Sequence, residues 1–310
     1  MDTTRIENSV NTEQLKNSRV VIVGLGGAMT IGEGLVRCGV GSLTAIDPDV
    51  VDETNVVRQG HSRIGEKKVR AAEARFREIN PELDFLGIAL RTDQIPLEHW
   101  KEILHDTDLL IMATDSFEAQ AFGNRLALMT NTPTLWIGLY PEAVAGEIVW
   151  WTPDHQDCFR CLLEYRFLNQ EESPKDPASD GALIQDLHIV DGIAGQLALA
   201  ILTRGSEGYF GQLIEKLGER QFLHIKLRHD WLLAGVDPVA NTLDIAPSND
   251  AYFCWNSVVR RNGPRLAACP DCEELRNRSF NEDEFAAVEI SEEEFEQSTD
   301  QSVSPTDIGL

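Results

Sequence analysis

The chain has 310 residues, 42% of them hydrophobic, which is enough apolar material to bury the core of one large domain or two modest ones. Its formal net charge of −24 disfavours a nucleic-acid partner, because phosphates repel an acidic surface and no basic stretch offsets the charge. No stretch approaches the roughly 20 apolar residues that cross a bilayer, and the polar start does not resemble a signal peptide. We therefore expect a cytoplasmic globular protein with no membrane partner.

Strands alternate with helices in the pattern of the first 140 residues. The run RVVIVG at 19–24 is typical of a buried parallel strand that ends in a glycine turn. The other expected elements are helices over 30–38, 67–79 and 117–129 and strands over 42–46, 85–90, 108–113 and 134–139. This alternation predicts an α/β, doubly wound, mostly parallel Rossmann-like sheet, whose ligands bind at the carboxyl ends of the strands.

The pattern changes after residue 140. We expect a strand over 147–151, a helix over 187–203 and a strand over 222–227, which together predict a C-terminal mixed or antiparallel extension of the sheet. A polar loop at 169–181 separates the first of these elements from the second. Residues 281–310 carry ten Asp or Glu and no Lys or Arg, a composition typical of a disordered tail.

A glycine-rich turn lies between the first strand and the first helix. Without side chains at Gly24, Gly26 and Gly27, backbone amides can approach a phosphate at the start of a helix. Asp47, at the end of the second strand, is placed to bond a ribose hydroxyl. A nicotinamide dehydrogenase would use the same turn, although Met29 occupies the position of the usual third glycine.

The segment after the second strand distinguishes a nicotinamide dehydrogenase from other nucleotide-binding proteins. It contains an Asn-x-x-Arg-Gln element at 55–59 and a Gly-x-x-Lys-Val element at 65–69, and a Thr-Asp pair follows the strand expected at 108–113. In this order the motifs resemble those of the ThiF, MoeB and HesA family, relatives of the ubiquitin-activating enzymes. The positions that match the family pattern are Asp47, Asn55, Arg58, Gln59, Lys68, Thr114 and Asp115.

The resemblance implies an adenylyltransferase. Such an enzyme would bind ATP and Mg²⁺, couple AMP to the C-terminal carboxylate of a small ubiquitin-like or sulfur-carrier protein, and release pyrophosphate. Arg58 and Lys68 would neutralise the triphosphate, Asn55 would polarise the α-phosphate region, and Asp115 would hold Mg²⁺. Asp115 could equally be the N-cap of the helix that follows it.

The resemblance also implies a homodimer in which an N-terminal arginine reaches the partner's nucleotide site, and Arg5 is the candidate for that role. It implies one adenylation domain over 1–280, with a nucleotide-binding half at 18–140 and a zinc-braced substrate half at 141–280 that includes a crossover loop at 165–185.

Two Cys-x-x-Cys pairs predict a structural zinc site. Cys158 and Cys161 form one pair and Cys269 and Cys272 the other, and two such knuckles present four thiolates to one ion. A closed shell of four sulfur ligands leaves no open coordination position, so this zinc would brace the fold.

The acyl acceptor is left open by the sequence. Family members that pass the acyl group to their own thiol carry a cysteine in the crossover loop, whereas residues 162–253 contain none and Ser179 falls near that place. Either Ser179 accepts the acyl group as an oxyester, with a conjugating enzyme acting next, or the reaction stops at the adenylate. The alternatives are adenylation of a peptide or of a tRNA-linked carboxylate, and a non-catalytic partner subunit.

Overall fold

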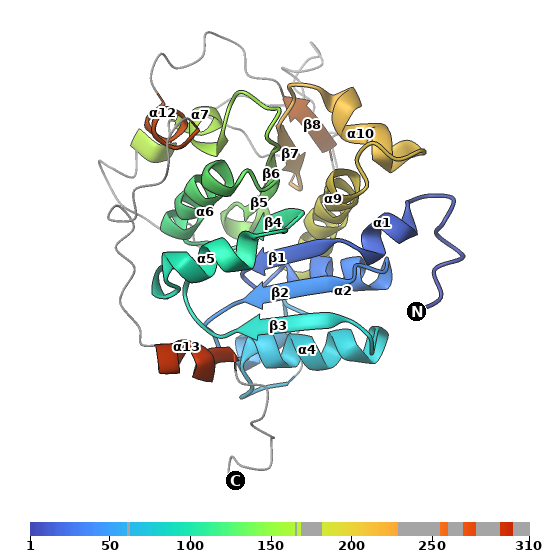
Figure 1. The fold of residues 1–310 in the computed structure, drawn as a ribbon, viewed down its shortest axis with the longest axis vertical. Coiled ribbons are helices and arrows are strands. Elements are labelled where there is room, and N and C mark those ends of the chain that lie inside the picture. The colour runs from blue at the N-terminus through green and yellow to red at the C-terminus, as the bar shows by residue number, and fades with distance from the viewer. Residues whose placement is uncertain are drawn as a thin grey trace.

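A single twisted sheet organises the chain (Figure 1). The computed structural model describes residues 1–60, 63–164, 166–168, 182–228, 255–259, 269–276 and 292–299. Within these ranges the strands are β1 (Arg19–Val23), β2 (Ser42–Ile46), β3 (Asp84–Ile88), β4 (Leu109–Met112), β5 (Thr134–Leu139), β6 (Ala145–Trp151), β7 (Phe222–Lys226) and β8 (Trp255–Val259). The helices are α1 (Thr12–Lys16), α2 (Met29–Arg37), α3 (Glu53–Val56), α4 (Lys68–Ile79), α5 (Leu97–Leu104), α6 (Phe117–Thr130), α7 (Phe159–Leu162), α9 (Ile184–Leu202), α10 (Tyr209–Leu217), α12 (Pro270–Leu275) and α13 (Glu292–Thr299), and the 3₁₀ turns are η1 (Thr92–Gln94) and η2 (Pro141–Ala143).

The sheet order is β3-β2-β1-β4-β5-β6-β7-β8. Strands β1 to β5 pair in parallel, while β6, β7 and β8 continue the same sheet with antiparallel pairing. The order reverses between β1 and β4, and in doubly wound sheets this reversal opens a crevice for ligands at the carboxyl ends of the strands. The predicted fold class, including the antiparallel extension, is confirmed.

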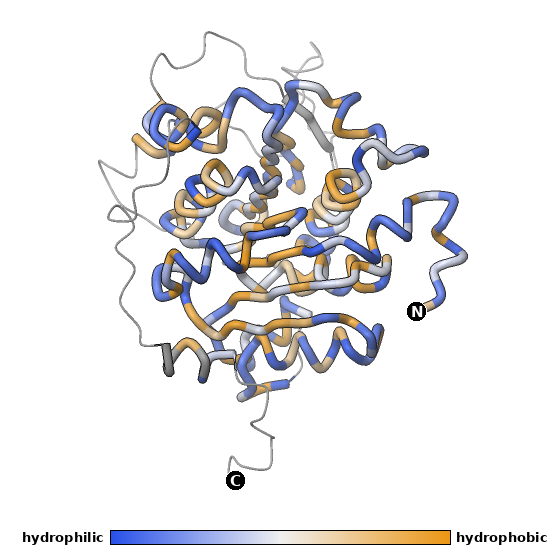
Figure 2. Tube along the Cα trace, viewed as in Figure 1, coloured by the Kyte–Doolittle hydropathy of each residue, from blue (hydrophilic) through white to orange (hydrophobic). Residues whose placement is uncertain are grey.

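Each face of the sheet carries its own core. Alternate residues of β1 point to opposite faces, so Val20 and Ile22 join the core under α2, α4 and α9, while Val21 and Val23 join the core under α5 and α6. Figure 2 shows the apolar strands enclosed between helices that present polar residues outward. No helix in the described ranges combines the length and apolar character that a membrane span requires.

Several elements were absent from the sequence-based expectations, among them α5, α10, β8 and α13. Helix α5 had a readable signal, because Leu97, Trp100 and Leu104 recur on one face and are all buried. Helix α13 falls inside the stretch expected to be a disordered tail. It packs beside β3, where its Phe295 ring lies 4.0 Å from the His99 ring, centroid to centroid.

Candidate active site

The glycine turn between β1 and α2 is built for close backbone approach. Gly24 has φ +90°, and a Cβ atom there would lie 2.5 Å from the carbonyl oxygen of Ala113, so only glycine fits. A Cβ on Gly26 would lie 3.2 Å from the Gln59 amide nitrogen, and one on Gly27 would lie 3.1 Å from a methyl carbon of Leu187. We call residues 24–27 the glycine loop. The glycine loop is therefore confined by side chains from two distant parts of the chain, Gln59 and Leu187.

Met29 does not disturb this turn. Its side chain is buried and packs toward Gly60, where an added Cβ would lie 3.1 Å from the Met29 Cγ. The close helix packing that a third glycine supplies in dinucleotide-binding turns is provided one turn later by Gly32. A Cβ there would lie 2.6 Å from the Phe76 ring. The position of Gly32 inside α2 explains why the motif search missed it.

Asp47 and Lys68 meet beside the loop. Asp47 follows β2 and is buried; its Oδ2 accepts a 2.7 Å hydrogen bond from the backbone of Leu25. The Lys68 Nζ lies 3.9 Å from the same oxygen and donates a 2.8 Å hydrogen bond to Asp49. The motif identified Asp47 and Lys68, whereas Asp49 was missed although it stands two residues from Asp47.

Asn55, Arg58 and Gln59, the residues of the Asn-x-x-Arg-Gln element, line the same cavity. Asn55 is buried in α3, where its side-chain oxygen accepts a 3.1 Å hydrogen bond from the backbone of Asp52. The Gln59 side chain is buried against Gly26, and its Oε1 has no hydrogen-bond partner in the described part of the chain. A buried acceptor without a partner is costly, so this oxygen marks a place where a ligand donor would be favourable.

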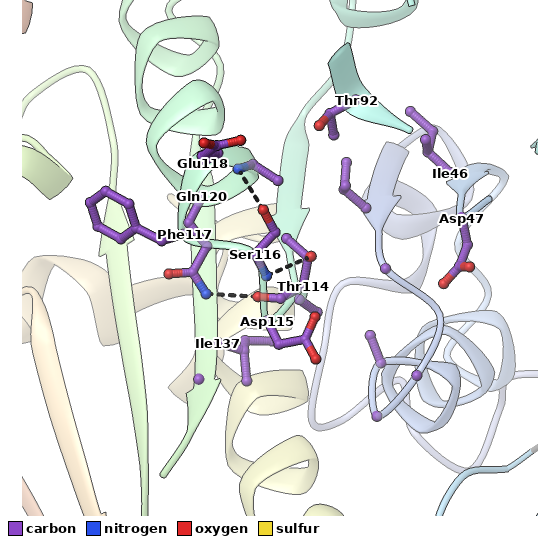
Figure 3. Close-up of a pocket in the computed structure, with 18 of the residues that line it drawn as sticks. Ile46, Asp47, Thr92, Thr114, Asp115, Ser116, Phe117, Glu118, Gln120 and Ile137 are labelled. Carbon is purple, nitrogen blue, oxygen red and sulfur yellow. Dashed lines mark hydrogen bonds between the residues drawn. The ribbon is translucent and has the colours of Figure 1, made fainter. Parts of the chain in front are cut away.

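Asp115 projects from the carboxyl end of β4. Its side chain is exposed at the cavity, and Figure 3 shows it directed away from α6. The alternative that Asp115 caps this helix is wrong, because Ser116 is the N-cap and its Oγ accepts a 3.3 Å hydrogen bond from the backbone of Ala119. Gln120 further fixes the turn by donating a 2.8 Å hydrogen bond to the carbonyl oxygen of Thr114.

One cavity of about 1370 Å³ collects these groups. Pockets for a single small ligand typically measure roughly 300–1,000 Å³, so this cavity has room for a nucleotide and part of a second substrate. The residues predicted from sequence that line it are Gly24, Gly26, Gly27, Asp47, Asn55, Arg58, Gln59, Lys68, Thr114 and Asp115.

The antiparallel strands supply a charged wall that the sequence did not reveal. Glu147 of β6 is buried, and it binds Arg166 at 2.6 Å and accepts a 2.8 Å hydrogen bond from the Tyr140 hydroxyl. Burial and the Glu147 charge raise the pKa of Tyr140. Burial alone would lower the pKa of Arg166, but the adjacent carboxylate raises it. All three residues line the cavity.

Two predicted site residues are not among the described residues that line this cavity. Arg5 is exposed in the N-terminal segment and does not line the cavity of its own chain. The neighbouring Thr3 lies beside Gly39, where an added Cβ would be 3.3 Å from the Thr3 Cγ2; Gly39 follows α2 at the end opposite the glycine loop. Ser179 lies outside the described residues, as does most of the crossover loop.

The four predicted metal-ligating cysteines form one buried cluster. Their sulfur atoms all lie within 4.8 Å of one another, with 3.7 Å between those of Cys158 and Cys161 and 3.7 Å between those of Cys161 and Cys272. All four are unoxidised. The two pairs come from α7 and α12, which pack on the outer end of α6.

Polar groups around the cluster hold it in place. Asn124 of α6 donates hydrogen bonds of 2.7 Å to Asp271 and 3.6 Å to the Cys158 sulfur, and its oxygen accepts from the backbone of Phe159 at 3.0 Å. Asp271 in turn lies 3.3 Å from Arg160 and 3.6 Å from Arg125, two arginines that line the cavity. The cluster is thus linked to the cavity wall through one buried carboxylate.

Comparison with known proteins agrees with this geometry. A model of the ThiF family matches residues 4–240. The chain belongs to the ThiF family. Its glycine loop, its Asn-x-x-Arg-Gln element and Asp115 all fall inside the matched range.

Curated relatives include ubiquitin-like modifier-activating enzyme 5 of Dictyostelium discoideum, 28% identical over 69% of this chain and 58% of the relative. The sulfur carrier protein ThiS adenylyltransferase of Bacillus subtilis is 32% identical over 49% of this chain and 46% of the relative. The chain thus spans about half the length of the curated relatives it matches. Among solved structures, Escherichia coli MccB with ATP shares the fold, with a TM-score of 0.58 and 17% identity over 84% of this chain and 68% of that one.

Proposed function

We propose that this chain adenylates the C-terminal carboxylate of a small ubiquitin-like or sulfur-carrier protein, using ATP and Mg²⁺ and releasing pyrophosphate. The observation that carries the proposal is that Arg58, Lys68 and Asp115 line one large cavity together with the glycine loop. The names of the relatives point to the same reaction, because they include a carrier-protein adenylyltransferase and a modifier-activating enzyme.

The chemistry needs positioning and charge neutralisation. The substrate carboxylate is already a nucleophile, so its oxygen can bond to the α-phosphorus while the bond to pyrophosphate breaks, without a general base. Arg58 and Lys68 would offset the charge that develops on the pyrophosphate. Asp115 offers an exposed carboxylate of the kind that Mg²⁺ prefers, and the ion would neutralise phosphate charge there.

ATP–pyrophosphate exchange tests this assignment. Arg58→Ala and Asp115→Ala should each lower exchange by roughly a hundredfold or more, the usual cost of removing a group that stabilises transition-state charge. Arg63→Ala and Asp154→Ala are matched controls, because neither residue lines the cavity. Arg63 pairs with Glu66, and Asp154 pairs with Arg204. Full exchange by either site variant would refute the proposed site.

We further propose that the cysteine cluster holds a structural zinc ion. Four sulfur atoms within 4.8 Å, buried and without disulfides, match the donor set that tetrahedral zinc takes. The Asn124 amide beside Cys158 is the kind of neighbouring donor that orients a metal-bound thiolate. A reducing compartment such as the cytoplasm would keep these thiols available for metal.

A homodimer is part of the proposal. Residues 50–64 carry four exposed apolar side chains, including Val57 at 74% and Ile64 at 57% exposure, and a second copy would cover them favourably. Arg5, which does not line its own cavity, would then be available to the partner's nucleotide site. Arg5→Ala should lower exchange without changing the mass of the dimer in light scattering.

The fate of the acyl group is the remaining branch. Transfer to Ser179 would give an oxyester, which a conjugating enzyme could then accept. Discharge from the adenylate directly would leave no enzyme adduct. The structural likeness to MccB, described as a microcin C7 biosynthetic enzyme, motivates a second candidate in which the carboxylate belongs to a peptide. Offering the enzyme a carrier protein and a peptide separately in the exchange assay would distinguish the two substrates.

A further inference from the structure

Asp191 is a buried acid at the cavity for which the sequence motifs assign no task. It lies on α9, it is 4% exposed, and it lines the cavity together with Leu187 and Val190 of the same helix. Its Oδ2 has no hydrogen-bond partner among the described residues. Burying a carboxyl group in this way is unfavourable unless something else uses it.

The position of Asp191 relative to the glycine loop indicates what that use is. A Cβ on Gly27 would lie 3.8 and 3.9 Å from the two carboxyl oxygens of Asp191. The carboxyl group therefore faces the glycine loop at Gly27, where no side chain separates it from the backbone. Gln59 stands against Gly26 on the same loop, also with a partnerless buried oxygen. Two unsatisfied polar groups therefore bracket the space in which backbone amides approach a phosphate.

Within the described part of the chain, no cation is paired with Asp191. Burial is the one influence on its pKa, which is raised well above the ordinary value, and no charged or hydrogen-bonding group shifts it. The strands that pack against α9 carry three ionisable residues of the cavity lining at or after them: Asp115 after β4, Tyr140 after β5 and Glu147 of β6, the last bound to Arg166. On the two helices that pack against α9, the charged residues pair with each other or are exposed: Glu33, Arg37, Glu215 and Lys216.

We propose that Asp191 is a nucleotide-binding residue that, as a neutral carboxylic acid, donates a hydrogen bond to a phosphate oxygen of ATP over Gly27. An ionised carboxylate at this place would repel the triphosphate, whereas a protonated one adds a donor to the backbone amides of the loop. Asp191 and Asp115 then act in opposite protonation states in one cavity. Asp191 donates a hydrogen bond as a neutral acid, whereas Asp115 must be ionised to hold a cation.

The inference rests on the proposed nucleotide site, and the test separates the two. Affinity for a non-hydrolysable ATP analogue is measured by calorimetry without divalent metal, on the wild type, Asp191→Asn, Asp191→Ala and the exposed control Asp154→Asn. Failure of the wild type to bind would refute the nucleotide site itself. If the wild type binds, the Asp191 variants decide the inference.

Asp191→Asn keeps a neutral donor of the same shape and should bind within about threefold of the wild type. Asp191→Ala should bind roughly ten- to hundredfold more weakly, the usual worth of a hydrogen bond to a charged group. Wild-type affinity should fall as pH rises and Asp191 ionises, while the affinity of Asp191→Asn should not follow that transition.

Three results would overturn the inference. Equal weakening by Asp191→Asn and Asp191→Ala would mean that the ionised carboxylate is needed. Wild-type affinity in Asp191→Ala would mean that the side chain does not contact the nucleotide. The infrared difference spectrum of wild type minus Asp191→Asn at neutral pH should contain the carbonyl band of a protonated acid, and its absence would show that Asp191 is ionised. Melting temperatures of all variants serve as the folding control.

Discussion

The parallel half of the molecule, β1 to β5, and the antiparallel half, from β6 onward, build the cavity in different ways. In the parallel half each site residue follows a strand or a glycine turn closely, as Asp47 follows β2 and Asp115 follows β4. In the antiparallel half the cavity wall depends on contacts between distant stretches of chain, as when the cavity-lining Arg160 pairs with Asp271 across 111 residues. Local sequence order therefore specifies the first half of the site, and tertiary packing specifies the second.

Of the changes that test this comparison, removal of the proposed metal should lower the stability of the protein most. Chelation, or Cys272→Ser, should destabilise the protein by about 4–5 kcal/mol, because α7 and α12 would lose the zinc ion that we propose joins them. Calorimetric melting measures this loss. Cys38→Ser is the control, since Cys38 is a half-buried residue at the C-cap of α2 and lies outside the cluster. An unchanged melting temperature in verified metal-free protein would mean that the antiparallel half does not depend on metal.

Breaking the charged wall should have the next largest effect. Arg166→Ala leaves Glu147, which is 7% exposed in its side chain, without its cation, and should lower the free energy of unfolding by about 3 kcal/mol. Denaturant unfolding checks the value. Adding Glu147→Gln in the same chain should recover most of the loss, because the unpaired charge is gone. If the double variant is no more stable than Arg166→Ala, then packing, and not charge, holds this wall.

A pair of glycines in α2 tests the parallel half. Gly32→Ala places a Cβ 2.6 Å from the buried Phe76 ring and should destabilise the protein by about 1–3 kcal/mol. Gly34→Ala meets nothing within 4 Å and should stabilise it by about 0.5–1 kcal/mol through helix propensity. Denaturant unfolding of both variants should give opposite signs. Equal signs would contradict the close packing of α2 on α4.

Asp191 provides the smallest test, at the contact between the two halves. Its pKa is raised in the folded protein, so above about pH 4 the unfolded chain releases a proton that the folded chain retains. Its contribution to stability therefore falls as pH rises, by at most about 1.4 kcal/mol per pH unit, until the folded group ionises too. The stability difference between Asp191→Asn and wild type, measured by urea unfolding, should widen with pH over this range. A difference independent of pH would mean that Asp191 titrates normally.

The sequence was a good guide where chemistry is local. The order of strands β1 to β5, the glycine loop, the Asn-x-x-Arg-Gln element and both cysteine pairs were all found in advance. These features are encoded over a few residues by periodicity, turn chemistry or ligand spacing.

The features that were missed depend on contacts between distant segments. Neither the pairing of Glu147 with Arg166 nor the packing of α9 on the glycine loop follows from local patterns. Asp191 did leave a signal, since it is a charged residue within the apolar run IVDGIAG of a buried helix. A rule that treats such residues as site candidates would have found it.

The central claim is adenylation at this cavity, and intact-mass spectrometry tests it most directly. The full chain is mixed with ATP, Mg²⁺ and a ubiquitin-like or sulfur-carrier protein, and wild type is compared with Asp115→Ala and Ser179→Ala. The account predicts an AMP adduct on the carrier that depends on Asp115. An enzyme adduct that survives thiol reductant and is absent in Ser179→Ala would add the oxyester step. A carrier that stays unmodified, with no pyrophosphate released for any carrier or peptide offered, would contradict the account.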